Sequence, residues 1–407
     1  MSIDSLFSKL RYLPLFILGF SGIFGTSKGL VISALVFLAY YIRFRPRLPL
    51  FKNKLVWRTW ILFFVSLCTF SLSIFLSDPS NDYKFVVHVV EMAIPFLLFS
   101  LYCYDDLNCC LLFAWRGMCL GTLLHGICVI FIKASGMVRP YNWVGIANDI
   151  GGMFTMVLFV VAGGLYYIWH NKYDRLFGIS AFVVGFLALI ASYSRGAIGS
   201  FVIAFCVVGI IATVLGLIKV NRKFIITISC VGLFLLMANL LFGQNPLQAR
   251  SYDSERVGMR ISSMRMFMDH PASGVGFGNF NREFRKECYR SKLSVSNTFT
   301  HPHNIYWHYL SQGGIVGTVG VACMFFYQMY VLVKEFVDKK NAKWIRILAL
   351  CMFGLFVSIL VHGWVDVNFE RRNYKRLFWV LWGFYCLALF CYENNFLNRK
   401  VEKSNYA

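Results

Sequence analysis

Residues 196–217 read GAIGSFVIAFCVVGIIATVLGL, an apolar run without a charged side chain. A helix needs about 20 mostly apolar residues to cross a membrane, so this stretch predicts a membrane-spanning helix. Across all 407 residues, 58% are hydrophobic and 14% are charged, whereas a soluble domain carries about a quarter charged residues. The composition therefore excludes an ordinary soluble protein, and it excludes a disordered chain more firmly still.

Similar apolar runs recur along the whole chain. We therefore predict an all-α polytopic membrane protein with about twelve transmembrane helices. The expected spans are 10–26, 29–44, 57–77, 85–102, 110–132, 151–169, 177–193, 196–217, 223–242, 308–333, 344–363 and 377–392. The first two are the shortest and least regular. Because no small-residue cleavage site follows the first run, we interpret it as a span and not as a cleaved signal.

The lysines and arginines of the short loops indicate the orientation of the chain, because cytoplasmic loops carry an excess of them. With the N-terminus inside, the cytoplasmic segments hold 21 of these residues and the short outer segments hold nine. We therefore expect both termini to lie in the cytoplasm. This bias also accounts for much of the formal net charge of +21.

One outer loop, from about residue 243 to 302, is far longer than a typical connection. It carries nine Lys and Arg residues against five Asp and Glu residues, together with patterned apolar positions, so we expect it to be folded and functional. The loop divides the chain into a membrane bundle over 1–242 with nine spans, a loop domain with short helices over 243–307, and a portion over 308–407 with the last three spans and a cytoplasmic tail. It has no counterpart in the first half, which counts against the matched halves of many transporters.

Several arginines on the outer side are candidates for binding an anion. Arg195 lies in Ser194-Arg195-Gly196 at the edge of the membrane core, where an arginine is costly and usually has an anionic partner. A snorkelling interfacial arginine is the alternative. Arg256 and Arg260 lie one turn apart on a predicted helix, which makes either an anion clamp or a solvated basic face. Arg265 is five residues beyond Arg260 and points elsewhere.

A histidine precedes the span 308–333. Pro302 punctuates the chain there, so His303 would stand near the N-terminus of that helix, where a neutral imidazole could remove a proton from a hydroxyl. His301, His303 and His308 could instead bind a metal ion, but no carboxylate lies at ligand spacing beside them, so we expect none. The glycines of 274–279 lack the GK[ST] ending of a phosphate-binding loop, and we interpret them as a tight turn.

These motifs, in this order and at these positions, resemble those of O-antigen ligases. The ligases belong to a wider family with O-antigen polymerases and protein O-oligosaccharyltransferases. The sharpest match is the family's His-(Asn/Ser/Gln), nine residues, then Gly-x-x-Gly-Thr, which falls on His303-Asn304 and 314–318. The other matches are Ser-Arg-Gly at 194–196, Gly-x-Arg at 258–260 and Pro-x-x-Gly-x-Gly at 271–276. Met264 departs from the pattern, because many relatives carry tryptophan four residues after that arginine.

The resemblance implies a GT-C-like glycosyltransferase in a bacterial inner membrane, acting on the periplasmic face without metal or ATP. The donor would be O-antigen carried on undecaprenyl pyrophosphate, and the acceptor would be a sugar hydroxyl of lipid A–core. His303 would be the general base of an inverting displacement, and Arg195 and Arg260 would hold the pyrophosphate.

Further candidates have lower rank. For the pyrophosphate they are Arg256, Arg265 and Lys84; on the acceptor side they are His301, Asn304, Asp366 and Arg371. A basic outer loop would also concentrate such anionic substrates. Membrane lipids are expected partners, nucleic acid is not, and the sequence leaves the oligomeric state open.

Three other functions are compatible with the same composition. An O-antigen polymerase would use the same donor with a second lipid-linked chain as acceptor. A protein O-oligosaccharyltransferase is usually longer, with an added C-terminal domain. A lipid-linked sugar flippase or transporter, a different class, would need paired bundles and a charged central cavity but no catalytic base.

Overall fold

The computed structural model describes residues 12–24, 27–44, 53–77, 84–101, 106–137, 139–142, 145–168, 171–218, 253–291, 293 and 301–405. Apart from an isolated bridge between Asn142 and Gly145, every regular element within these ranges is a helix. The helices are α2 (Leu13–Phe24), α3 (Ser27–Phe44), α4 (Lys54–Ser77), α5 (Lys84–Leu101), α6 (Leu107–Ala134), α7 (Ala147–Ile168), α8 (Lys172–Ala191), α9 (Arg195–Val214), α11 (Asp253–Asp269), α12 (Phe280–Phe284), α13 (Ile305–Val337), α14 (Lys343–Gly363), the 3-10 helix η2 (Asn368–Glu370) and α15 (Arg372–Asn405).

The described part of the chain confirms an all-α polytopic membrane protein. Eight helices are long and apolar enough to cross a membrane, namely α4, α6, α7, α8, α9, α13, α14 and the first 23 residues of α15. Shorter apolar helices cover Leu13–Phe24 and Val86–Leu101. All of the predicted spans coincide with helices except 223–242, which lies outside the described residues, as does the predicted boundary at residue 242.

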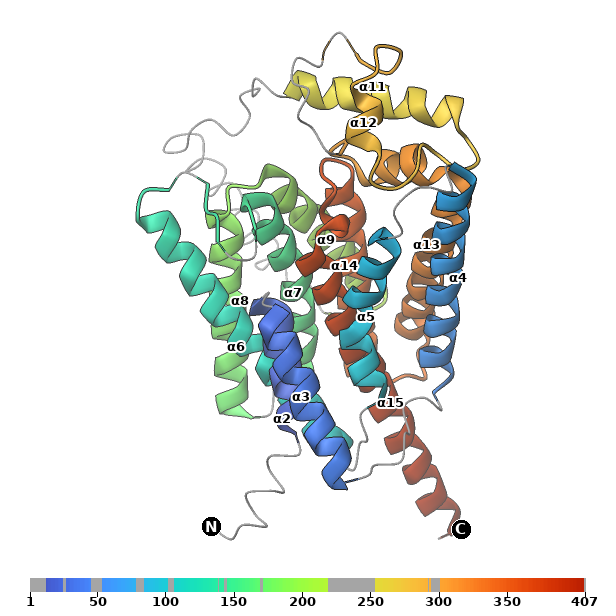
Figure 1. The fold of residues 1–407 in the computed structure, drawn as a ribbon. Helices are drawn as coiled ribbons and strands as arrows, with labels where there is room; N and C mark the ends of the chain where they lie inside the picture. The colour runs from blue at the N-terminus through green and yellow to red at the C-terminus, as the bar shows by residue number, and fades with distance from the viewer. Residues whose placement is uncertain are drawn as a thin grey trace.

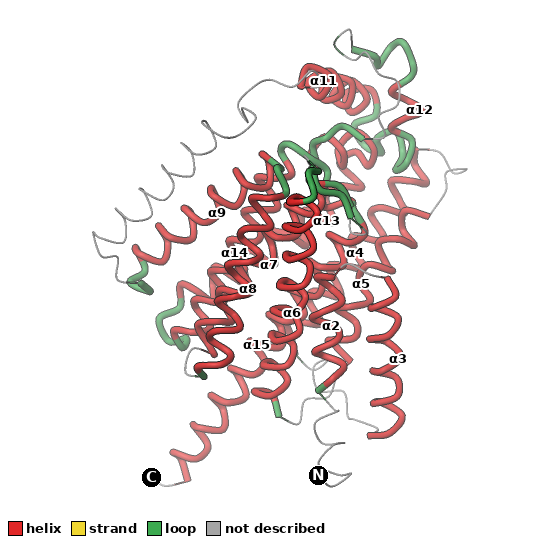
Figure 2. Tube along the Cα trace, turned by 90° about the vertical axis from the view of Figure 1, so that its left-hand side faces the viewer, coloured by secondary structure: helices red, strands yellow, loops and turns green. Residues whose placement is uncertain are grey.

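The helices form a bundle capped at one end by a separate layer. Figure 1 shows α11 lying across that end, roughly perpendicular to the other helices, and Figure 2 shows the same layer from the side. The C-terminal end of α15 lies at the opposite end of the bundle in both views. The cap has its own small hydrophobic core, formed by Met259, Met266, Val275, Phe280, Phe284 and Tyr289.

The cap is attached to a break in α13. Gly314 has φ 57° and ψ −163°, so the helical hydrogen bonds are interrupted there. The turn over residues 271–276 supplies replacements: the amides of Val275 and Gly276 donate to carbonyls of α13, each at 2.9 Å, while amides of α13 donate to Pro271 (2.9 Å) and Ala272 (3.0 Å). The two glycine-containing motifs at 271–276 and 314–318 therefore join the cap to the membrane bundle.

The Ser73 hydroxyl of α4 reinforces this junction. It lies 2.9 Å from the carbonyl oxygens of both Ser273 in the turn and Gly313 in α13. Buried backbone carbonyls need partners, and the single proton of this hydroxyl serves one of the two carbonyls at a time or is shared between them. The junction thus ties together three separate segments at the base of the cap.

Replacing Gly274 with alanine is expected to destabilise this junction by about 2–3 kcal/mol. Gly274 has a φ of +64°, and an added Cβ would overlap the backbone of Gln312, so the turn could not keep its hydrogen bonds to α13. Thermal unfolding in detergent and trypsin cleavage of the cap measure the effect. Gly278→Ala is the matched control, because its φ of +88° imposes similar strain but nothing lies within 4 Å of the added carbon. Equal stability of the two variants would contradict the role of this junction.

Candidate functional site

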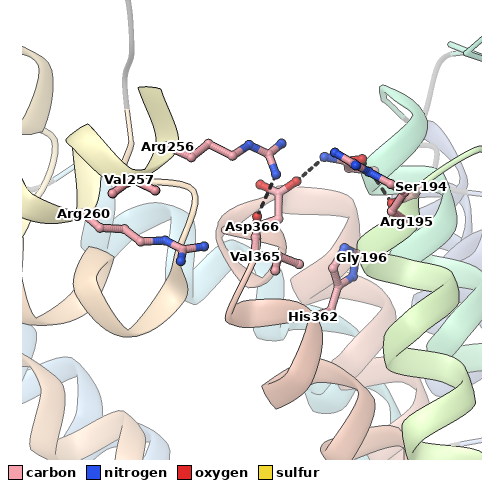
Figure 3. A pocket seen from close by; sticks show the side chains of 10 residues that line it. Ser194, Arg195, Gly196, Arg256, Val257, Arg260, His362, Val365 and Asp366 are labelled. Atoms are coloured by element: carbon pink, nitrogen blue, oxygen red, sulfur yellow. Dashed lines mark hydrogen bonds between the residues drawn. The ribbon is translucent and has the colours of Figure 1, made fainter. Parts of the chain in front are cut away.

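Beneath α11, four separate segments of the chain surround a cavity of about 340 Å³ (Figure 3). They are the start of α7, the start of α9, α11 itself, and the end of α14 with the loop after it. The lining residues are Asn148, Ser194, Arg195, Gly196, Arg256, Val257, Arg260, His362, Val365 and Asp366. The sequence motifs around Arg195 and Arg260, which lie far apart along the chain, therefore meet at one site.

Arg195 reaches the cavity because it is the first residue of α9. Ser194 caps this helix, its hydroxyl accepting a hydrogen bond from the Ala197 amide at 3.4 Å. α7 can approach closely because its Gly151 has no side chain; an added Cβ would lie 2.8 Å from the Cβ of Ala197. Arg195 thus lies at a positive helix N-terminus, where anions bind favourably.

Arg256 and Arg260 enter the cavity from the opposite side, on α11 (Figure 3). Arg256 Nη1 donates to the carbonyl of Val365 at 3.3 Å, and Arg260 Nη2 donates to the carbonyl of Trp364 at 2.9 Å. Burial, and then the like charge of Arg256, lower the pKa of Arg260. An anion in the cavity would relieve this unfavourable crowding of positive charge.

Asp366, which lines the cavity, pairs with His303, which lies outside the lining. His303 Nδ1 lies 3.2 Å from Asp366 Oδ1, which also accepts the Val367 amide at 2.8 Å. Burial alone would raise the pKa of Asp366, but the hydrogen bond from His303 and the charges of His303 and His362 hold it below its ordinary value. An ionised Asp366 favours a proton on Nδ1, which leaves Nε2 of His303 as the proton acceptor.

His303 has an unusual backbone conformation, with φ 49°. Residues other than glycine seldom adopt this backbone conformation. Those that do cluster at active sites, where the surrounding structure holds them in it. Asn304 provides that enforcement: its Oδ1 caps α13 through the Trp307 amide at 3.0 Å, and its Nδ2 donates to the Trp364 carbonyl at 2.9 Å. Asn304, predicted on the acceptor side, thus anchors the loop that carries Asp366.

Asn148 holds the other side of Asp366, although it belongs to none of the sequence motifs described above. Its Nδ2 donates to Asp366 Oδ2. Its Oδ1 accepts from Ser194 Oγ at 3.1 Å and from Arg139 Nη2 at 2.9 Å. Two polar residues, Asn148 and Asp149, directly precede an apolar span on the outer side, which was the available signal. His362, near the outer end of α14, is a second polar lining residue that the sequence motifs do not mark.

His301 joins the pair in a cluster that could hold a metal ion. Its ring centroid lies 4.4 Å from that of His303, and one potential ligand atom from each of His301, His303 and Asp366 lies within 4.8 Å of the others. Burial, and then the charge of His303, lower the pKa of His301 to about 3, so its imidazole is neutral. This carboxylate could not be predicted from the sequence around the histidines, because Asp366 lies 63 residues after His303 along the chain.

Two further candidates, Arg265 and Arg371, lie outside the cavity lining, as do His301, His303 and Asn304. Arg265 Nη1 donates to the Arg290 carbonyl at 3.1 Å, within the cap. Arg371 is half-exposed and lies 3.4 Å from Asp149 Oδ1. Lys84 is the first residue of α5, and its side chain lies outside the described structure.

A comparison with protein-family models gives a match to the family described as O-antigen ligase, over residues 180–322. A search of the curated proteins gives no match. The matched range contains Arg195, Arg256, Arg260 and His303, and it includes the junction between the cap and α13. Asn148 and Asp366 lie outside it.

Proposed function

We propose that this chain, whose residues 180–322 match the O-antigen ligase family, transfers O-antigen polysaccharide en bloc from undecaprenyl pyrophosphate to a sugar hydroxyl of lipid A–core. The family match and the apolar helices support a membrane enzyme of the ligase or polymerase type. We place the reaction on the periplasmic face of a bacterial inner membrane, with both termini in the cytoplasm. The observation that carries the proposal is the convergence of Arg195, Arg256, Arg260 and Asp366 on one cavity, with His303 outside the lining but 3.2 Å from the Asp366 carboxylate.

In the proposed reaction, His303 is the general base. The acceptor hydroxyl oxygen attacks the anomeric carbon of the donor, and His303 Nε2 takes the hydroxyl proton as the new glycosidic bond forms. The bond between the anomeric carbon and the pyrophosphate oxygen breaks at the same time, so the configuration inverts. Asp366, which is 3.2 Å from Nδ1, stabilises the imidazolium that results.

The arginines stabilise the leaving group. Undecaprenyl pyrophosphate gains negative charge as the bond to the sugar breaks, and Arg195, Arg256 and Arg260 line the cavity in which that charge would develop. Arginine suits this role because its planar guanidinium presents paired donors to phosphate oxygens. The energy comes from cleavage of the pyrophosphate linkage, so the proposal requires no ATP.

An apolar groove of about 200 Å³ supports a lipid-linked donor. It runs along α13 and α14, and its walls include Ile305, Tyr306, Phe325 and Leu360. Ile305 is two residues after His303, so the groove starts close to the proposed base. We assign the sugar-pyrophosphate end of the donor to the charged cavity and its hydrocarbon chain to the groove, where burial of apolar surface would add affinity.

The proposal is tested by incubating the purified protein with lipid-linked O-antigen and rough lipopolysaccharide, without ATP. We expect a ladder of O-antigen chains on lipid A–core. Longer donor chains without such a ladder would identify a polymerase, and an unchanged donor and acceptor would contradict both activities. Transport of the donor across vesicles without any product would favour a flippase.

Removal of metal ions is expected to leave the ladder unchanged, because the proposed base needs no metal ion. The protein is treated with EDTA, the chelator is removed, and the initial rate is measured before and after adding Mg²⁺ or Zn²⁺. Metal-dependent transferases lose the charge stabilisation that the ion supplies. Loss of the rate with recovery on adding one of these ions would assign His301, His303 and Asp366 to metal binding instead.

A further inference from the structure

A second charged pocket lies at the end of the bundle away from α11. It occupies about 440 Å³ between the first turn of α4, the last turns of α13 and the C-terminal part of α15. Figure 1 shows these helix ends on the side of the molecule opposite to the cap. Its polar lining residues include Asn53, Lys54, Arg58, Lys334, Glu335 and Glu393. The pocket is far from the proposed transferase site and plays no part in that reaction.

The positive and negative groups of this pocket form no close ion pairs, although the charge of Lys334 acts on both Glu335 and Glu393. Among the described residues, no ion pair within 4.0 Å joins Lys54, Arg58 or Lys334 to a carboxylate. The two carboxylates are instead oriented by amides: Asn53 Nδ2 donates to Glu393 at 3.3 Å and Asn341 Nδ2 donates to Glu335 at 2.8 Å. The pocket therefore offers separate cationic and anionic groups to a ligand.

The pocket lies at the depth of lipid headgroups. α4 begins at Lys54 and α13 ends at Val337, and both are long and apolar enough to cross a membrane. The charged lining residues therefore lie within the terminal turns of membrane spans. Tyr327 and Tyr330 complete the wall, and tyrosine is enriched at the membrane–water interface. A ligand at this depth would be a component of the lipid leaflet.

We propose that this pocket binds the headgroup of an aminophospholipid such as phosphatidylethanolamine. The phosphate contacts Lys54, Arg58 and Lys334, since basic pockets between transmembrane helices bind lipid phosphates. The primary ammonium carries three donors and contacts Glu335 and Glu393. An anionic headgroup without the ammonium would meet two carboxylates, and a trimethylated ammonium has no N–H to donate.

The test measures binding of short-chain lipids to the purified full-length protein by native mass spectrometry. The lipids are phosphatidylethanolamine, phosphatidylcholine and phosphatidylglycerol, and no O-antigen substrate is present, so the result is independent of the transferase activity. We expect phosphatidylethanolamine to bind about tenfold more tightly than the other two, as for one charge-assisted hydrogen bond. Equal or tighter binding of phosphatidylglycerol would overturn the proposal.

Two sets of variants assign the roles of the charged groups. Glu335→Gln with Glu393→Gln is expected to abolish the preference for phosphatidylethanolamine while keeping the acceptor oxygens that Asn53 and Asn341 use. Lys54→Ala with Arg58→Ala is expected to weaken binding of all three lipids. Lys339→Ala is the control, because it changes a lysine near the same end of α13 that does not line the pocket.

A preference for phosphatidylethanolamine that persists in the double glutamine variant would also overturn the proposal. Thermal unfolding of each variant in detergent checks that it is folded. If the double variant is unstable, Glu393→Gln alone provides the comparison, because Glu393 is exposed.

Discussion

His303→Ala is expected to lower the rate of O-antigen transfer by about 10²–10⁴-fold, the usual contribution of a general base. The protein would still bind its donor, because the arginines of the cavity are unchanged. The measurement is the initial rate of ladder formation at saturating donor and acceptor. His270→Ala is the matched control, because His270 is an exposed histidine of the cap that does not line the cavity.

The companion variant Asp366→Asn separates the histidine's chemistry from its position. An asparagine keeps the size of the side chain but removes the charge that holds a proton on His303 Nδ1, so we expect a loss of similar order. Both variants should unfold at temperatures close to that of the native protein, although Asp366→Asn also weakens the hydrogen bonds from Asn148 and Val367. Ladder formation by His303→Ala at the native rate would show that His303 is not the base.

The membrane helices could be predicted from the sequence because hydropathy is a local property. A run such as 196–217 must bury its backbone in a helix wherever it lies in the bilayer, and the structure places α9 over most of that run. The helix count is less accessible, since short runs such as 10–26 depend on their neighbours. The packing order of the helices depends on contacts between distant segments, which a hydropathy pattern does not contain.

The candidate site could be predicted in part for the same reason. Arg195 and His303 lie next to helix starts marked by Ser194 and Asn304, and those local signals are readable. The pairing of His303 with Asp366 cannot be predicted from the sequence, because it joins a loop before α13 to a loop after α14. Asn148 is still further away, 218 residues from the carboxylate to which it donates.

The structure also changes the interpretation of the glycine motifs. From the sequence, the glycines of 274–279 are a tight turn, and those of 314–318 are part of the resemblance to O-antigen ligases. In the structure, the turn and the break at Gly314 form backbone hydrogen bonds with each other. The Ser73 hydroxyl, which completes the junction, lies 200 or more residues earlier in the sequence. These backbone hydrogen bonds hold the cap, and with it Arg256 and Arg260, in place relative to His303.

Removal of the two best-placed arginines, by Arg195→Ala with Arg260→Ala, is expected to lower kcat by at least about 10³-fold, since one lost donor to a developing oxyanion typically costs 10²–10³-fold. The two guanidiniums enter the cavity from opposite sides (Figure 3), so neither can replace the other. Because the charge on the leaving group grows towards the transition state, kcat should fall by a larger factor than KM for the donor rises.

The controls must distinguish this chemical effect from loosening of the cap, because Arg260 also donates to the Trp364 carbonyl at 2.9 Å. Arg265→Ala removes an arginine from the same helix that bonds within the cap and does not line the cavity, and it should retain activity. Arg260→Lys keeps a positive charge but loses the paired donors, so it should recover part of the rate. A double variant with unchanged donor affinity and unchanged kcat would eliminate the pyrophosphate clamp. Donor affinity and kcat could instead both fall, with no recovery in Arg260→Lys and with a lower unfolding temperature. That result would show that Arg260 mainly holds α11 in place.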